Sequence, residues 1–581
     1  MSESAINHDL AGLMNQLFYG DNLQVLRDSI ADSSVDLVYL DPPFNSQANY
    51  NLLFKAPSGE HSEAQIEAFE DTWHWNDSAE AAYDEVMQSG NTDISELLAA
   101  LRSFLKENDM MAYLTMMAVR LLELHRVLKP TGSLYLHCDP TASHYLKLVL
   151  DGIFGIENFR NEIIWRRTGS HNSKKIYGPI HDTILFYTRS EHYTFDVVKR
   201  PYMAGHVNGR YTKDPTSGKL KFTSGGNVMT GADKRTGESG QPWRGFNPTA
   251  KNRHWAIPGF LAEQMPPEYE SLGVLAKLEA LYEAKLIDIE PGNAWPTPVR
   301  YLSEDDGQPV QDIWAAQPYT EGTVYGTESV IDADVAWLGT TAPERLGYPT
   351  QKPVGLLERI IETSTKEGDV VLDPFCGCGT TIHASQKTKR QWIGIDITHL
   401  AISLIEKRLK DAFPGILFEV HGTPKDIAGA KALADADKYQ FQWWAVSLVN
   451  AVPYGGKKKG ADSGIDGFIY FKPDGKKTEK AIVSVKGGSN VNVAMVRDLA
   501  HVVDREKAKI GVFVTLTAPT KPMLTEAVKV GYFETPFGKY AKIQIITIDE
   551  LFGGKKLNIP LVDSGFKKAQ TESPQKQHKL I

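Results

Sequence analysis

Two acid–proline segments, each directly after a short apolar run, constrain the fold of this chain more than any other feature. The first is VDLVYLDPPF at residues 35–44, and the second is VVLDPFCGCGTT at residues 370–381. Short apolar runs of this kind predict buried strands. Each strand is expected to end before the proline, because proline has no N–H to donate to a strand ladder. Ligands of open α/β sheets bind at the carboxyl ends of the strands. We therefore expect both segments at one ligand-binding edge of a sheet.

The second segment has the pattern strand, acid, glycine turn and helix start. Gly377 and Gly379 let the backbone approach a ligand where a Cβ atom would clash. About twenty residues later, Asp396 ends the next apolar run, QWIGID. An acid at that place commonly holds the ribose hydroxyls of an adenosine-type cofactor. The dinucleotide-binding alternative requires GxGxxG, which this loop lacks.

With both loops considered together, the chain resembles the amino-methylating DNA methyltransferases that use S-adenosylmethionine. Members of that family carry a cofactor loop DPFxGSGTT and a catalytic loop [DS]PP[YFW], matched here by DPFCGCGTT and DPPF. The catalytic loop comes first, as in the β group of the family. Gly20-Asp21, His181-Asp182 and TQKP at 350–353 also look like family motifs, and the resemblance covers roughly residues 15–420. Cys378 departs from the usual serine and removes a good hydroxyl donor.

The resemblance implies a catalytic loop at Asp41, Pro42, Pro43 and Phe44. The Asp41 carboxylate and the Pro42 carbonyl would accept N–H bonds from an exocyclic amine, which frees the nitrogen lone pair. Phe44 would stack on a base flipped out of the duplex. Aspartate in the first position goes mostly with adenine-N6 in the family and serine with cytosine-N4, so we expect adenine, with cytosine as the alternative. The residues expected at the cofactor are Asp21, Lys352, Asp373, Phe375, Gly377, Gly379, Thr380 and Asp396.

Residues 190–340 differ in composition from their flanks. This stretch is rich in Gly, Pro, Thr, Trp and basic residues and has weak periodicity, which is typical of a loop-rich inserted domain. PWRGF and RHW interleave aromatic and basic residues, so target recognition is expected here. The alternative is a small subdomain whose tryptophans only pack. The candidate DNA-binding residues are Trp243, Arg244, Arg253 and His254.

The last part of the chain resembles the Mrr-like branch of restriction-endonuclease folds. Such nucleases need an acid on one strand and (D/E/Q)xK on the next, where carboxylates bind Mg²⁺. Asp466 and Lys486 fill two of these places, with Asp466 as the expected metal ligand, but Ser484 stands where an acid or glutamine belongs. Two interpretations of this domain therefore remain open: an active Mg²⁺-dependent nuclease, or a nuclease-like domain that binds DNA without cutting it. Lys457 and Lys458 are candidate phosphate contacts, although a solvated loop is equally compatible with KKK.

The charge distribution supports a polyanionic partner for the C-terminal part. The whole chain of 581 residues has a net charge of −9, but residues 437–581 contain 23 Lys/Arg against 14 Asp/Glu. A basic segment on an acidic body suggests double-stranded DNA as the partner. No apolar run approaches the ~18–20 residues of a membrane span, and the start MSESAINHDL lacks a secretion signal. With three cysteines and no disulfide framework, a cytoplasmic location is expected.

The expected fold is α/β: a permuted Rossmann-like methyltransferase sheet with an inserted target-recognition region, followed by a restriction-endonuclease-like α/β domain. Three functions remain open: an adenine-N6 DNA methyltransferase with a nuclease-like appendage, a bifunctional restriction–modification enzyme, and a DNA-binding protein without catalysis. Dimers occur in the family, so a homodimer is one expectation. The expected segments are 1–189 (catalytic half, with an insertion at 55–110), 190–340 (target recognition), 341–423 (cofactor half), 424–437 (linker), 438–565 (Mrr-like domain) and 566–581 (polar tail).

Overall fold

The protein was analysed as a computed structural model, which divides into two compact units. The first runs up to Val198 and contains Gln311–Ala316 and Asp334–Pro574, and the second contains Lys199–Val310 and Gln317–Ala333. The structure describes residues 15–43, 49–55, 61–70, 74–170, 175–223, 229–289, 295–303, 305–339, 341–346, 348, 350–454, 464–474, 477–536, 538–560, 562–563 and 569–572.

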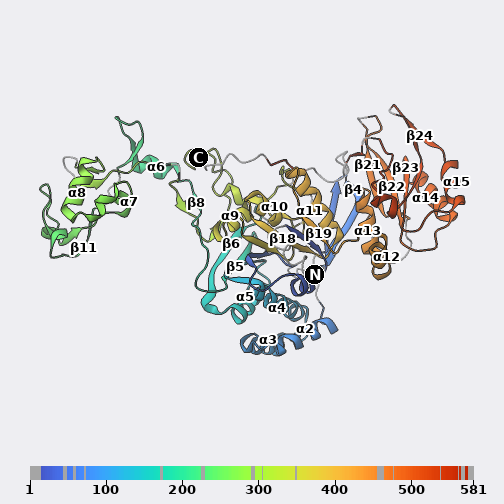
Figure 1. The fold of residues 1–581 in the computed structure, drawn as a ribbon, viewed down its shortest axis with the longest axis horizontal. Coiled ribbons are helices and arrows are strands. Elements are labelled where there is room, and N and C mark those ends of the chain that lie inside the picture. Colours follow the sequence, from blue (N-terminus) through green and yellow to red (C-terminus); the bar gives the residue numbers. More distant parts are fainter. Residues whose placement is uncertain are drawn as a thin grey trace, which may run out of the picture. The chain divides into compact units, whose positions relative to one another are not determined.

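A nine-stranded sheet forms the centre of the first unit (Figure 1). Its strand order is β16-β6-β7-β5-β2-β17-β18-β1-β19, and all neighbouring pairs are parallel except those made by β7. This mostly parallel sheet, assembled from distant parts of the chain, confirms the predicted permuted methyltransferase fold. The strands are β1 (Gln16–Tyr19), β2 (Val35–Leu40), β5 (Leu128–Cys138), β6 (Phe159–Arg166), β7 (His181–Thr188), β16 (Ile313–Trp314), β17 (Val370–Asp373), β18 (Gln391–Asp396) and β19 (Glu419–His421).

Helices pack against both faces of this sheet (Figure 1). Helix α4 (Asp109–Val127) is capped by Asn108, whose side chain accepts the Met111 N–H. Within the described chain no helix, α4 included, is long and apolar enough to span a bilayer. One layer contains α1 (Asn22–Ser29), α4 (Asp109–Val127) and α5 (Ser143–Phe154), and the other contains α9 (Val354–Ser364), α10 (Thr380–Lys387) and α11 (His399–Ala412).

The insertion expected at 55–110 contains a hairpin and two helices. The hairpin pairs β3 with β4, and the helices add apolar side chains such as Val86 and Leu98 to the core beside α4. The elements are β3 (Asn49–Lys55), β4 (His61–Glu70), α2 (Asp77–Gln88) and α3 (Thr92–Leu105).

The second unit consists of short strands and helices around a small aromatic core. Trp243, Trp255, Leu278 and Leu281 are buried in it, which explains how a segment with weak periodicity still folds. Its elements are β8 (Lys199–Arg200), α6 (Ala204–Arg210), β9 (Tyr211–Lys213), β10 (Leu220–Phe222), β11 (Thr230–Ala232), β12 (Arg253–Trp255), α7 (Gly259–Ala262), α8 (Val274–Glu283), β13 (Ile287–Asp288), β14 (Thr297–Pro298) and β15 (Gln308–Pro309).

The C-terminal domain of the first unit is an α/β sheet in the order β20-β21-β22-β23-β26, with β27 beside β21. Residues 424–437 differ from the predicted linker: α12 forms there because Asp426 caps it and alanines favour helix, and Ala430 and Ala434 are buried. The elements are α12 (Ile427–Ala436), α13 (Lys438–Leu448), β20 (Val452–Pro453), β21 (Gly467–Phe471), β22 (Glu479–Lys486), α14 (Val493–Arg505), β23 (Ile510–Thr515), α15 (Lys521–Lys529), β24 (Tyr532–Thr535), β25 (Gly538–Ala541), β26 (Ile543–Thr547), α16 (Ile548–Phe552) and β27 (Val562–Asp563).

Candidate active site

Four neighbouring parallel strands end at one pocket. Asp41 follows β2, Asp373 ends β17, Asp396 ends β18, and the Gly20-Asp21 pair follows β1. Because β2, β17, β18 and β1 are consecutive in the sheet, their carboxyl ends bring these acids together, although Asp21 and Asp41 lie far from Asp373 and Asp396 in the sequence. The pocket has a volume of about 370 Å³. The structure therefore unites the two acid–proline loops.

The glycine loop between β17 and α10 is tightly packed. Gly379 adopts a left-handed conformation at φ 73°, and a Cβ atom there would lie 2.7 Å from the Ile405 side chain. Gly377 has φ 50°, and a Cβ atom would lie 3.4 Å from the Tyr348 ring. Gly377, Phe375 and Thr380 line the pocket. The glycines thus keep the backbone open to a ligand at a turn that other residues would strain.

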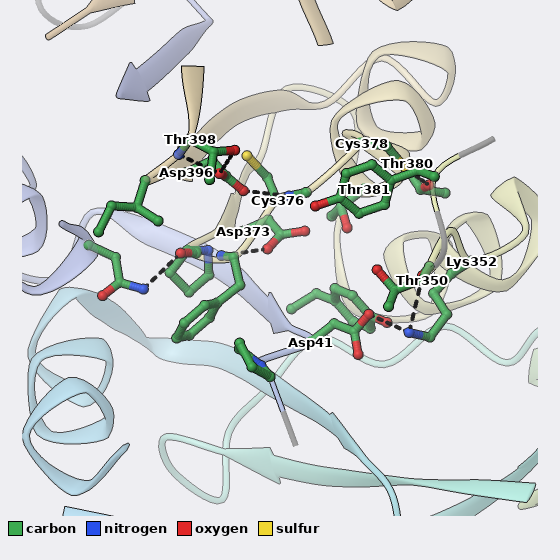
Figure 2. A pocket seen from close by; sticks show the side chains of 18 of the residues that line it. Asp41, Thr350, Lys352, Asp373, Cys376, Cys378, Thr380, Thr381, Asp396 and Thr398 are labelled. Atoms are coloured by element: carbon green, nitrogen blue, oxygen red, sulfur yellow. Dashed lines mark hydrogen bonds and ion pairs between the residues drawn. The ribbon is translucent and has the colours of Figure 1, made fainter. Parts of the chain in front are cut away.

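Asp396 is held by hydrogen bonds on both carboxylate oxygens. The Gly377 N–H donates to Oδ2 at 2.9 Å, and the backbone N–H and hydroxyl of Thr398 donate to Oδ1, each at 2.8 Å (Figure 2). Burial raises the pKa of Asp396 to about 6, against the opposing effect of these donors. The charged form is therefore costly in the free protein, and further hydroxyl donors from a ligand would favour it.

Asp373 is more deeply buried than Asp396. Its Oδ1 accepts the Phe375 N–H at 3.0 Å, and only 3% of the residue is exposed. Burial raises the pKa of Asp373 to about 7, although a hydrogen bond from Thr381 opposes this. Near neutral pH this carboxyl is poised between its two charge states.

Asp41 lies on the opposite side of the pocket from Asp396, and its carboxylate faces Lys352 (Figure 2). The Lys352 ammonium donates to Asp41 Oδ2, and both side chains are mostly buried. Lys352, which is expected at the cofactor, lines the pocket, and its ammonium pairs with Asp41. Pro43 lines the pocket, Pro42 is buried, and Phe44 lies outside the described residues.

The structure adds residues that the sequence did not single out. Arg120, buried on α4, donates from Nη2 to Asp21 Oδ2 at 3.0 Å and from Nε to Asn22 Oδ1 at 2.7 Å. Asn22 donates to the Pro374 carbonyl at 2.9 Å, which ties the β1 end to the cofactor loop. Arg120 and Tyr348 line the pocket. No pattern marks either residue, because each comes from an element that reads as ordinary core or loop.

In the second unit, the candidate DNA-binding residues are engaged in the protein itself. Trp243 is 6% exposed and donates from its indole to Glu279 at 2.9 Å, and His254 is also buried. Arg244 pairs with Glu279 and lies over the Tyr282 ring, and Arg253 donates to Thr230 at 2.9 Å. These contacts favour the packing interpretation for Trp243 and His254 over base stacking.

The expected nuclease residues lie at the ends of β21 and β22. Asp466 precedes β21 and is 6% exposed, and its carboxylate accepts hydrogen bonds from the Gln442 amide and the Val485 N–H. Ser484 is buried, and Lys486 ends β22. Among the residues that the structure describes, no group of three or more His, Cys, Asp or Glu side chains could hold a metal ion. Lys457 and Lys458 lie outside the described residues.

Comparison with known families gives a match over most of the chain. A family model described as DNA methylase, for N6 and N4 methyltransferases, matches residues 35–407. The chain belongs to this family. A second model, described as NACHT-associated inactive restriction endonuclease 1, matches residues 446–552. This match supports the predicted nuclease-like domain, and the Mrr-like assignment stays a prediction.

Curated relatives are restriction–modification methyltransferases. M.EcaI of Enterobacter cloacae, a type II methyltransferase, is 27% identical over 398 residues, covering 68% of this chain and 69% of that protein. The Mod subunit of the type III enzyme StyLTI of Salmonella typhimurium is 27% identical over 382 residues, and the chain spans 49% of its length. M2.DpnII of Streptococcus pneumoniae is 39% identical over 106 residues, covering 18% of this chain and 32% of that protein.

Two solved structures are also similar. The M1.HpyAVI–SAM complex is 13% identical and covers 68% of this chain and 98% of that chain, with a TM-score of 0.29. PvuII DNA methyltransferase, which is cytosine-N4-specific, is 12% identical and covers 69% of this chain and 88% of that chain, with a TM-score of 0.31.

Proposed function

We propose that this DNA methyltransferase transfers a methyl group from S-adenosylmethionine to the exocyclic N6 of an adenine flipped out of double-stranded DNA. One observation carries the proposal: the Asp41 loop and the glycine loop open onto a single pocket. A methyl donor and a target amine can therefore meet without a large movement of the sheet.

The pocket fits S-adenosylmethionine at the glycine loop. Its volume of about 370 Å³ is in the range of small-molecule sites, and both loop glycines occupy conformations that would be strained with a side chain. Asp396 provides carboxylate oxygens for ribose hydroxyls, and Asp373 and Asp21 add negative charge toward a cationic ligand. When bound, the cofactor supplies a methyl group already activated by its sulfonium.

The target amine needs an acceptor, and the Asp41 carboxylate can provide one. Lys352 occupies Asp41 Oδ2, which fixes the carboxylate and leaves Oδ1 to accept an N–H bond of the amine. Accepting that bond draws the nitrogen toward tetrahedral geometry and makes its lone pair available. Asp41 does not have to be a strong base, because a methylated aminium loses its proton readily. Flipping a base costs a few kcal/mol, which stacking in the pocket offsets.

Adenine is proposed over cytosine because an aspartate leads the DPPF loop. The test is methylation-sensitive sequencing of DNA from cells that lack other methyltransferases and express this chain. Methylated adenine at one recurring sequence supports the proposal, and methylated cytosine-N4 replaces it with the alternative specificity. Cells expressing Asp41→Ala are the matched control, and marks that persist there would remove Asp41 from the mechanism.

For the C-terminal domain we propose a DNA-binding role without cleavage. The Asp466 carboxylate is occupied by Gln442 and Val485 donors, and Ser484 is a poor Mg²⁺ ligand. We expect no cutting of plasmid DNA with Mg²⁺ or Mn²⁺, whether the DNA is methylated or not. Cleavage by the full chain that Lys486→Ala abolishes would instead establish a bifunctional restriction–modification enzyme.

A further inference from the structure

Three buried polar side chains form a row beneath the Asp41 loop, on the adjacent strands β2, β5 and β7. The Tyr39 hydroxyl lies 2.9 Å from His137 Nδ1, and His137 Nε2 lies 3.2 Å from Asp182 Oδ2. All three residues are at most 2% exposed. Tyr39 is on β2, and Asp41 directly follows that strand; both residues line the pocket. The proposed chemistry does not use this row.

The donor and the acceptor of the hydrogen bond between His137 and Asp182 can be assigned. Burial alone would raise the pKa of Asp182, but the hydrogen bond from His137 and the nearby charges of Lys352 and Arg167 hold that pKa below its ordinary value. Arg167 approaches Asp182 Oδ1 at 3.3 Å. An ionised carboxylate only accepts hydrogen bonds, so Nε2 of His137 must carry the proton. With that proton on Nε2, Nδ1 is the ring nitrogen that can accept the Tyr39 hydroxyl.

The Tyr39 hydroxyl retains its proton. Burial, together with the negative charges of Asp41, Asp373 and Asp182, raises its pKa well above the ordinary value. A hydroxyl has one hydrogen to donate. That hydrogen can go to His137 Nδ1, or, where His137 does not accept it, it can turn toward the pocket that Tyr39 and Asp41 both line. A proton donated to Asp41 would occupy the oxygen that the target amine needs.

We propose that Asp182 and His137 are positioning residues that bind the Tyr39 proton and thereby keep Asp41 available to the target amine. Asp182 fixes the imidazole with its proton on Nε2, and His137 Nδ1 accepts the Tyr39 hydroxyl. The Asp41 carboxylate then accepts from Lys352 on Oδ2 and keeps Oδ1 for the target amine. This inference rests on the proposed role of Asp41. It predicts that removing His137 slows methyl transfer because the Tyr39 hydroxyl is released.

Rescue by a second substitution tests this prediction. Single-turnover methyl transfer from labelled S-adenosylmethionine is measured on DNA that carries the recognition site, together with cofactor affinity by calorimetry. His137→Leu should misplace one hydrogen bond at the Asp41 carboxylate. The free energy of one hydrogen bond corresponds to a loss of about tenfold or more in the transfer rate. Adding Tyr39→Phe to His137→Leu should restore the rate to within about threefold of wild type. Tyr39→Phe alone should be close to wild type, and cofactor affinity should not change.

Asp182→Asn provides an independent version of the test. The asparagine amide can donate to Nε2, which moves the imidazole proton to Nδ1 and releases the Tyr39 hydroxyl. Its rate loss should also be reversed by Tyr39→Phe. Tyr135→Phe is the matched control, because Tyr135 is a buried β5 tyrosine that is not a member of the row and whose hydroxyl bonds Ser364 at 2.8 Å.

The outcomes separate the inference from the proposed function. A double variant no faster than His137→Leu, or a Tyr39→Phe variant as slow as His137→Leu, would show that the row acts through packing and overturn the inference. His137→Leu with a wild-type rate would also overturn it. Asp41→Ala is measured in parallel: if it retains activity, the proposed role of Asp41 fails. If Asp41→Ala is inactive and no rescue occurs, only the inference fails.

Discussion

Replacing Asp396 by asparagine should change how the stability of the free protein depends on pH. Burial raises the pKa of Asp396 from an ordinary value of 3.8 to about 6. Between these values the folded state binds more protons than the unfolded state, so this carboxyl lowers stability as the pH rises. The full penalty above pH 6 is about 3 kcal/mol, and about 2 kcal/mol of it develops between pH 4.5 and 7.5. Asparagine has no charge and escapes this penalty.

The asparagine variant should therefore gain about 2 kcal/mol relative to wild type between pH 4.5 and 7.5. Any hydrogen bond that it loses to Gly377 or Thr398 adds an offset that does not depend on pH. The measurement is guanidinium unfolding without cofactor, followed by tryptophan fluorescence at several pH values. Asp435→Asn, at an exposed position, is the control. A difference between variant and wild type that stays constant within about 0.5 kcal/mol would refute the argued cost of burying Asp396.

Two further substitutions test the other parts of the pocket. Asp41→Ala should abolish methyl transfer and leave cofactor affinity within about twofold, because Asp41 faces Lys352 and the amine site; a turnover of a tenth of wild type or more would contradict this. Gly379→Ala should lower the free energy of unfolding by about 2–5 kcal/mol, since it adds left-handed strain and a contact with Ile405. Gly415→Ala has the strain at φ 86° without any neighbour within 4 Å, so it should cost only about 1 kcal/mol; equal losses in chemical denaturation would remove the packing argument.

The sequence predicts the strands and the shared edge well, because local signals determine them. The run 35–40 ends at a double proline, and the run 370–373 ends at a glycine turn, so β2 and β17 are found at the predicted places. Gly377 and Asp396 lie at the pocket, and Gly379 follows in the same glycine turn. These features depend on the chemistry of consecutive residues, which a single sequence displays.

Other features depend on which strands become neighbours, and one sequence does not show this. His137 and Asp182 join Tyr39 only because β5 lies between β2 and β7. The pairing of Lys352 with Asp41 spans 311 positions, so the TQKP motif by itself does not indicate it. Trp243 reads as a base-stacking residue beside Arg244, yet it is part of a buried cluster with Trp255 and Leu278. Residues 424–437 show that alanine-rich links can be helices when a cap and a packing face are present.

The pKa shifts of Asp182, in the buried row, and of Asp373 and Asp396, in the pocket, have opposite directions. Asp182 is paired with His137 and Arg167, which lowers its pKa, so its charge is compensated within the protein. Burial without a cationic partner raises the pKa values of Asp373 and Asp396, to about 7 and about 6. Carboxylates of this second kind gain most from a ligand that brings positive charge and hydroxyl donors. By linkage, a ligand that favours their charged forms lowers both pKa values and releases protons on binding. The free protein thus holds these two acids at a cost in stability that a cationic nucleoside ligand relieves, whereas the Asp182 row needs no ligand and is in place before one arrives.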